Sequence, residues 1–182
     1  MSHIRLGSPL VHISGFIAVS LALASCSSGT SEDKRDYSVP SSLCGTAMST
    51  SALKPLLPAG KKISSRQSGS TGYVRCQVSV DGQVVLSSII ERWKPKTTLT
   101  DVAFGTYGLT SDNVKKKKEN YIVADTTAVG HVTCRAKRKD GAEVFTVIRK
   151  EHGSVDVAAM EEAITKFTDA VSTSKQCTES NA

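Results

Sequence analysis

The sequence predicts an α+β domain in which two related antiparallel β units, hairpins or short meanders, pack against helices and are cross-linked by two disulfides. Three observations lead to this fold class. First, residues 72–76 and 130–134 share the pattern Gly-aromatic-Val-x-Cys, with histidine at the aromatic position of the second copy, and each is followed by Asp-Gly. Second, residues 156–172 carry apolar side chains at steps of three and four, which is typical of an amphipathic helix. Third, four cysteines, an even number, follow Cys26 in the part of the chain that we expect to be exported.

Composition bounds the size and the partners of this domain. The chain has 182 residues, of which 39% are hydrophobic and 22% charged, so we expect one modest core. Arg5 is the only charged residue before Cys26, and the chain from Cys26 onward therefore keeps 22 of the 23 basic residues against 17 acidic ones. This mild basic excess favours anionic partners without naming one.

Residues 1–25 are predicted to be a lipoprotein signal peptide. Arg5 precedes an apolar stretch from Pro9 to Ala24 that is shorter than the roughly 20 residues needed to span a membrane. The stretch ends in Leu-Ala-Ser-Cys, residues 23–26, which resembles the bacterial lipobox. We therefore expect cleavage before Cys26, lipidation of its thiol and anchoring at the extracytoplasmic face of the cell membrane. The alternative is an ordinary secretory peptide followed by a chance cysteine.

The segment after the lipobox divides the expected mature chain into a tether and a domain. Residues 26–42 are rich in serine and charge, so we expect a flexible tether that begins at the lipidated Cys26. Residues 43–182 are then a single α+β domain with an internal duplication, at about 43–95 and 96–178.

The remaining cysteines, Cys44, Cys76, Cys134 and Cys177, predict two disulfides in an oxidising compartment. Four cysteines allow three connectivities, and we favour Cys44 with Cys76 and Cys134 with Cys177, because each pair encloses one structural unit. A metal site is the competing interpretation. The sequence contains no Cys-x-x-Cys and has few histidines after the lipobox, so we predict neither a metal nor a cofactor.

The first unit combines a short helix with a hairpin. A helix is expected over Thr50–Leu57, ended by Pro58. Valines and Cys76 alternate with polar residues from Val74 to Val80, which predicts a strand with one face on the core. Asp-Gly at 81–82 suits a tight turn, and the strand returning over 83–93 is expected to be the more buried one. A lead-in strand is expected near Lys62–Ser64.

The second unit is expected to repeat this plan. A lead-in strand over Tyr121–Ala124 precedes a strand over Val132–Lys137, a turn at Asp140-Gly141 and a return strand over Glu143–Lys150. The helix at 156–172 would cover the sheet, and Ser154 or Asp156 would cap its start. Residues 95–120, between the units, are expected to be a loop with a short helix near Leu99–Phe104.

Two basic clusters are the candidate contacts for an anionic ligand. They are Lys115, Lys116, Lys117 and Lys118 in one run and Arg135, Lys137, Arg138 and Lys139 around the second hairpin. Outside the cell a nucleic acid is not an expected partner, so we consider an anionic cell-wall polymer, lipid headgroups or an envelope protein. The alternative is a solvated basic face. Residues 51–54 (Ser-Ala-Leu-Lys) and 111–113 (Ser-Asp-Asn) match two of the three motifs of serine β-lactamases, but no Lys-Thr-Gly follows and Pro55 adjoins the first motif. We therefore assign no catalytic residue.

The lipobox, the serine-rich tether, the early Leu43-Cys44-Gly45 and the later strand cysteine together resemble uncharacterised lipoproteins of actinobacteria, including those of the domain-of-unknown-function 3558 type. The resemblance covers organisation across the mature chain. It implies a location at the cell surface or wall and carries over no functional site. Our leading hypothesis is a non-catalytic binding module at the cell envelope. The alternatives are a small cell-wall-directed enzyme and a protein inhibitor or accessory subunit.

Overall fold

The computed structural model of the protein describes residues 35–135 and 140–178. The expected signal peptide, Cys26 and the basic residues Lys137, Arg138 and Lys139 lie outside the described residues.

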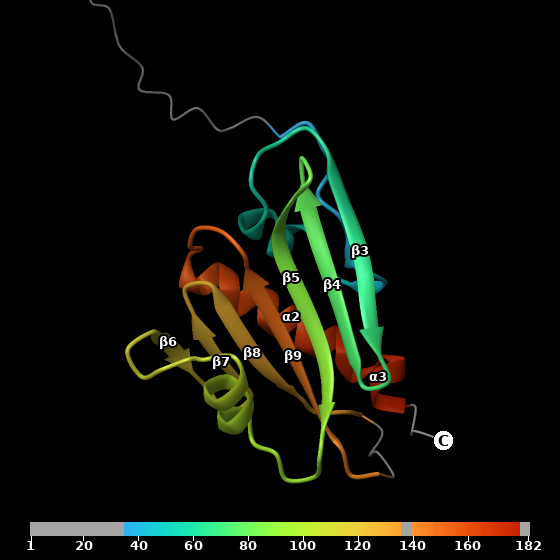
Figure 1. Cartoon of the computed structure of the whole chain (residues 1–182), viewed down its shortest axis with the longest axis vertical. Coiled ribbons are helices and arrows are strands. Elements are labelled where there is room, and N and C mark those ends of the chain that lie inside the picture. Colours follow the sequence, from blue (N-terminus) through green and yellow to red (C-terminus); the bar gives the residue numbers. More distant parts are fainter. Residues whose placement is uncertain (1–34, 136–139, 179–182) are drawn as a thin grey trace, which may run out of the picture. The chain divides into compact units, whose positions relative to one another are not determined.

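In this part of the chain, seven strands form one antiparallel sheet in the order β3-β4-β5-β9-β8-β7-β6 (Figure 1). The strands are β3 (Ile63–Ser70), β4 (Tyr73–Val80), β5 (Gln83–Trp93), β6 (Val114–Lys117), β7 (Tyr121–Ala124), β8 (Thr127–Val132) and β9 (Glu143–Lys150). The sheet consists of two meanders, β3-β4-β5 and β6-β7-β8-β9, whose last strands pair with each other. This largely β architecture with a few helices is consistent with the predicted α+β class, and both meanders belong to one continuous sheet.

Short helices and a small hairpin complete the fold. The hairpin pairs β1 (Ser42–Leu43) with β2 (Thr46–Ala47). The helical elements are α1 (Thr50–Leu53), a 3-10 turn (Lys54–Leu56), a π-helical segment (Asp101–Thr106), α2 (Val157–Ser172) and α3 (Lys175–Thr178). The helices predicted near residues 50, 100 and 156 are therefore present.

Helix α2 covers one face of the sheet and crosses behind β8 and β9 in Figure 1. Its apolar stripe is buried, with Met160, Ile164 and Phe167 each at most 1% exposed. The Asp156 side chain caps the helix by accepting hydrogen bonds from the backbone N–H groups of Ala158 and Ala159. Since a carboxylate at this position satisfies otherwise unpaired backbone donors, the helix begins where the sequence predicted.

The π-helical segment covers part of the opposite face. Its Val102 and Ala103 are fully buried and belong to a second apolar cluster with Phe145 of β9 and Ile122 of β7. The central strands are therefore buried on both faces, which explains why β5 is apolar along most of its length while β4 alternates.

The two copies of the Gly-aromatic-Val-x-Cys motif do not occupy equivalent positions. Gly72 lies in the β3–β4 turn with a φ of +81°, whereas Gly130 lies within β8. Cys76 is inside β4, but Cys134 follows the end of β8, so the strand predicted over 132–137 does not include residues 133–135. Residues 136 and 137 lie outside the described residues. There the chain leaves the sheet to reach the end of α2, where Arg135 donates its backbone N–H to the Ser172 carbonyl.

Residues 35–42, which the sequence assigned to the flexible tether, pack on the domain. The Arg35 guanidinium donates hydrogen bonds to the carbonyl groups of Leu57, at 2.5 Å, and Lys54, at 3.2 Å. Tyr37 donates its hydroxyl to the Pro58 carbonyl, and Tyr37 and Val39 contact the core. This part of the expected tether therefore packs against the folded domain.

Candidate functional site

A groove of about 530 Å³ lies between the first meander and the end of α2. Its floor consists of Gln67, Val74 and Ile90, one from each of the strands β3, β4 and β5. One wall is the turn and the second strand of the β1–β2 hairpin, residues 44–47. The opposite wall is Ala170 of α2 together with residues 174–176. The groove thus joins segments that are far apart in the sequence.

The hairpin wall is fixed by its turn and by a disulfide. Cys44 and Gly45 have φ values of 46° and 91°, and two successive positive values are typical of the tight turn in a two-residue hairpin. Cys44 is bonded to Cys76 of β4, with the two Cα atoms 5.7 Å apart. The Leu-Cys-Gly motif of the sequence is therefore a hairpin turn attached covalently to the sheet.

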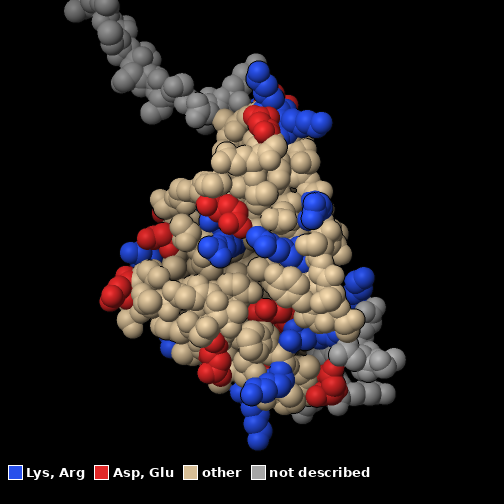
Figure 2. All heavy atoms as spheres, in the orientation of Figure 1, with Lys and Arg blue, Asp and Glu red and all other residues tan. Residues whose placement is uncertain are grey.

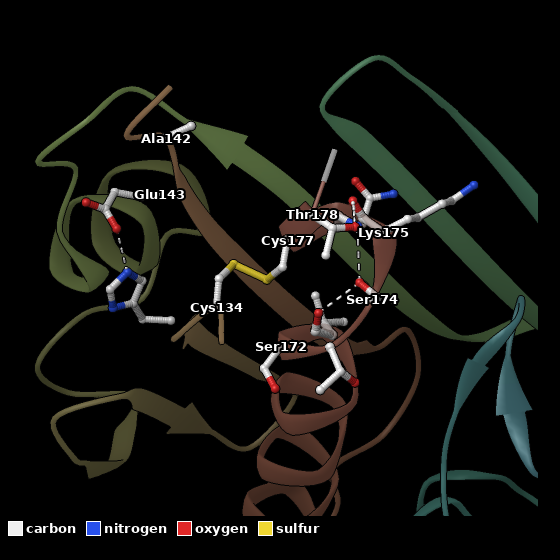
Figure 3. Close-up of a disulfide and its surroundings, with 12 residues drawn as sticks. Cys134, Ala142, Glu143, Ser172, Ser174, Lys175, Cys177 and Thr178 are labelled. Atoms are coloured by element: carbon white, nitrogen blue, oxygen red, sulfur yellow. Dashed lines mark hydrogen bonds and ion pairs between the residues drawn. A yellow bond between two sulfur atoms is a disulfide. The ribbon is translucent and has the colours of Figure 1, made fainter. Parts of the chain in front are cut away.

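The second wall is fixed in the same way. Cys177, in α3, is bonded to Cys134 after β8, with a Cα–Cα distance of 5.3 Å (Figure 3). The Ser174 hydroxyl donates to the Val171 carbonyl and accepts from the backbone N–H of Gln176, which turns the chain from α2 into α3. The two disulfides in the described chain join the pairs favoured from the sequence, and such bonds indicate folding in an oxidising, extracytoplasmic environment.

The lining of the groove combines an apolar centre with polar margins. Val74, Ile90, Ala47 and Ala170 supply apolar surface. The polar side chains of the lining come from Thr46, Gln67, Ser174, Lys175 and Gln176. An apolar concave surface with a few hydrogen-bonding groups is the usual composition of a ligand site. Lys175 is the charged residue of this lining, so the groove suits a neutral or anionic ligand.

The predicted basic clusters do not converge on the groove. Lys115 lies 3.5 Å from a carboxylate oxygen of Asp125, and Lys116 is paired with Glu161 on α2. Lys117, Lys118 and Arg135 are exposed, and none of them lines the groove. Figure 2 shows Lys and Arg spread over the visible face among Asp and Glu, without a single basic patch.

Glu161 connects the lysine run to the sheet. Its carboxylate accepts hydrogen bonds from Lys116 and from the Tyr121 hydroxyl. These two hydrogen bonds lower the pKa of Glu161, and the same carboxylate raises the pKa of Tyr121 to about 12. Part of the lysine run is therefore used to attach β6 and β7 to α2.

His131 lies beside a smaller depression of about 230 Å³. Its Nε2 is 2.9 Å from Oε2 of Glu143, which the dashed line in Figure 3 marks, and its ring stacks on Phe145 with centroids 4.9 Å apart. The sulfur of Cys134, also in the lining, is held in a disulfide. His131 therefore acts as a packed strand residue of aromatic size, and His152 lies elsewhere, beside Gln83.

Glu91 is a buried acid that the sequence analysis did not single out. It lies in the middle of the sheet, between Tyr73 of β4 and Phe145 of β9, and only 7% of it is exposed. Burial raises the pKa of its carboxyl, and the polar groups of Trp93 and Tyr107 offset only part of that effect. A charged residue within the apolar stretch 83–93 was the signal that could have identified it.

Replacing Glu91 by Gln is expected to stabilise the protein at neutral pH. A carboxyl whose pKa is higher in the folded state disfavours folding once the pH rises above its unfolded value, because the charged form must then be buried. Glutamine is neutral at every pH, so the gain should be present near pH 7 and disappear below about pH 4. Urea unfolding followed by circular dichroism measures it. Glu162→Gln, at an exposed position on α2, is the control, and an equal gain in both variants would contradict the interpretation.

Comparison with protein-family models, curated proteins and solved structures found no match. Within the described residues, no helix is long and apolar enough to cross a membrane. The same part of the chain contains no cluster of three or more His, Cys, Asp and Glu residues that could hold a metal ion.

Proposed function

We propose that this chain is a lipid-anchored extracytoplasmic protein whose domain is a non-catalytic binding module, with the groove between the β1–β2 hairpin and α3 as its ligand site. The observation that carries the proposal is the groove itself, an apolar floor between two walls that are each attached by a disulfide.

The covalent attachment of both walls matters for binding. The hairpin has two residues per strand and α3 has four residues, so neither element has enough internal hydrogen bonds to keep its position alone. The disulfides hold them on either side of the floor before a ligand arrives. A site that is ordered in advance binds with a smaller loss of conformational entropy.

The lipobox supports the location of this module. A diacylglyceryl group on Cys26 would bury two acyl chains in the bilayer at about 0.8 kcal/mol per methylene, which is sufficient for stable anchoring. The membrane is then the first partner of the chain, and ligands come from the envelope. Anionic wall polymers and envelope proteins remain the candidate partners there.

Binding of 1-anilinonaphthalene-8-sulfonate tests the groove, because this probe combines apolar rings with an anionic group that complements Lys175. The full chain with Cys26→Ser avoids lipid and detergent, which bind the probe themselves. This protein, with no change in the groove, should give a saturable increase in probe fluorescence. Ala170→Trp places a large side chain in the groove and should weaken probe binding by about tenfold or more. Ala47→Trp blocks the groove from the other wall. Because Ala47 is exposed, this second variant should fold and test the groove even if Ala170→Trp does not fold.

The matched control is the double variant His131→Ala and His152→Ala. Both histidines lie outside the groove lining, so probe binding should be unchanged. Unchanged binding in folded Ala170→Trp and Ala47→Trp proteins would overturn the groove as the ligand site.

A further inference from the structure

Strand β3 forms one edge of the sheet and is open along its length. Within the described sheet it pairs with β4 alone. Its first residue, Ile63, is partly buried and the other seven are exposed. It has no proline, its pairing with β4 is regular over all eight residues, and Arg66 is its only charged residue. An edge of this kind presents unpaired backbone donors and acceptors to a further strand.

The opposite edge differs in each of these respects. Strand β6 has four residues, Val-Lys-Lys-Lys, and its register with β7 shifts between Val114 and Lys116. Short length, lysines and irregular pairing are the features by which proteins block strand addition. The β6 edge of the sheet is therefore protected against strand addition, and the β3 edge is accessible to it.

The groove lies directly beside the open edge. Gly69, Val74 and Ile90 are neighbours across β3, β4 and β5, so the groove floor continues to the edge strand. A second depression of about 310 Å³ follows the end of β3 and is lined by residues 67–70 with Tyr73 and Val74. The β3 side chains along it are a glutamine, two serines and a glycine, and small residues of this kind let another backbone come close.

The pairing of β3 with β4 identifies which backbone groups are open. Asp81 donates its backbone N–H to the Lys62 carbonyl at 2.8 Å, so Lys62 directs its backbone groups towards β4. Orientation alternates along an antiparallel strand, and the register shows no irregularity. The backbone groups of Ser64, Arg66 and Ser68 therefore face β4, and those of Ser65 and Gln67 face outward.

We propose that the ligand of the groove is an extended segment of a partner polypeptide that pairs with β3 as an additional strand. This inference rests on the proposed function and names its ligand class. Main-chain hydrogen bonds to β3 supply affinity, and every second side chain of the segment points to the groove side of the sheet. The floor accepts apolar side chains, and Lys175 on the wall favours an acidic residue over a basic one on this face. Arg66, the neighbour of Gln67 along β3, favours an acidic residue on the opposite face.

A display library of random decapeptides tests the proposal on the full chain with Cys26→Ser. Selected peptides should alternate apolar and polar residues and be poor in Lys and Arg. Fluorescence anisotropy then gives the affinity of a labelled selected peptide for variants of the edge. Ser65→Pro removes an outward N–H that β4 does not use, and it should weaken binding by about tenfold or more. Ser65→Ala keeps that N–H and should bind like the wild type.

Hydrogen exchange provides a second measurement on the unmodified edge, in case Ser65→Pro does not fold. The bound peptide should slow exchange of the Ser65 and Gln67 amides and leave those of Lys117 and Lys118, beside the other edge, unchanged. Selected peptides that bind Ser65→Pro at full strength, or that protect no β3 amide, would overturn strand addition.

Two further outcomes separate this inference from the proposed function. If no peptide is selected while the naphthalene sulfonate probe still binds the groove, strand addition fails and the binding module stands. If neither binds, both proposals fail. A dimer of the chain that Ser65→Pro dissociates would identify a second copy as the strand that pairs with β3, and it would overturn the partner polypeptide proposed here.

Discussion

Replacing Cys134 and Cys177 together by alanine is expected to lower the free energy of unfolding by about 4 kcal/mol, from the entropy that a cross-link removes from the unfolded chain. The bond joins residues separated by 43 positions, which places it among long closed loops. Cys177 is only 1% exposed, so the substitution also removes buried contacts around α3. Urea unfolding followed by circular dichroism measures the loss.

The same variant should lose the second wall of the groove. Without the bond, the four residues of α3 have little to hold them, and their amides should exchange faster with solvent. Probe binding should weaken in parallel. The replacement of Cys44 and Cys76 is the comparison, because its loop is shorter, at 32 positions, and it releases the other wall. A loss below about 1 kcal/mol, with unchanged α3 exchange, would show that packing alone positions this wall.

Gly130→Ala is expected to cost about 3 kcal/mol, although it adds a single methyl group. Gly130 lies where α2 crosses β8, and a Cβ atom built there would be 2.3 Å from the Thr168 hydroxyl oxygen and 2.8 Å from that of Thr146. These two hydroxyls are hydrogen-bonded to each other at 2.7 Å in a buried site. The methyl group must either separate them or move the helix away from the sheet.

Gly105→Ala is the matched control for this position. Gly105 lies in the π-helical segment, and a Cβ atom there would meet nothing within 4 Å. Thermal unfolding of both variants should show a large loss for Gly130→Ala and little change for Gly105→Ala. Equal midpoints would mean that α2 does not approach β8 as closely as described.

The elements that sequence predicted well are those whose side-chain periodicity depends on one face being buried. The stripe of α2 and the alternation of β4 both follow directly from that condition. Strand β6 was not predicted because its three successive lysines show no alternation of apolar and polar residues. It is a strand because its backbone pairs with β7. The motif repeat predicted that strand β8 continues past Val132. It ends there because the Cys134 disulfide, a tertiary contact, takes the chain away from the sheet.

The candidate site could not be predicted from local sequence patterns, for a different reason. Its floor and walls come from residues 44–47, 67–90 and 170–176, which meet only after the sheet and α2 have assembled. The cysteines gave the one sequence signal, since the favoured pairing joins each wall to the sheet or to the loop that follows it. The ion pairs of Lys115 and Lys116 could not be predicted from local sequence, because their acidic partners Asp125 and Glu161 are identified only by the fold.

The hydrogen bonds of Arg35 to the carbonyl groups of Leu57 and Pro58 limit the distance between Cys26 and the folded domain. Nine peptide units separate Cys26 from Arg35, and even fully extended they cover about 30 Å. With residues 35–42 free, that span would nearly double. In the proposed anchored form, the domain would therefore stay close to the bilayer, and a polypeptide that binds it would have to come to the membrane first.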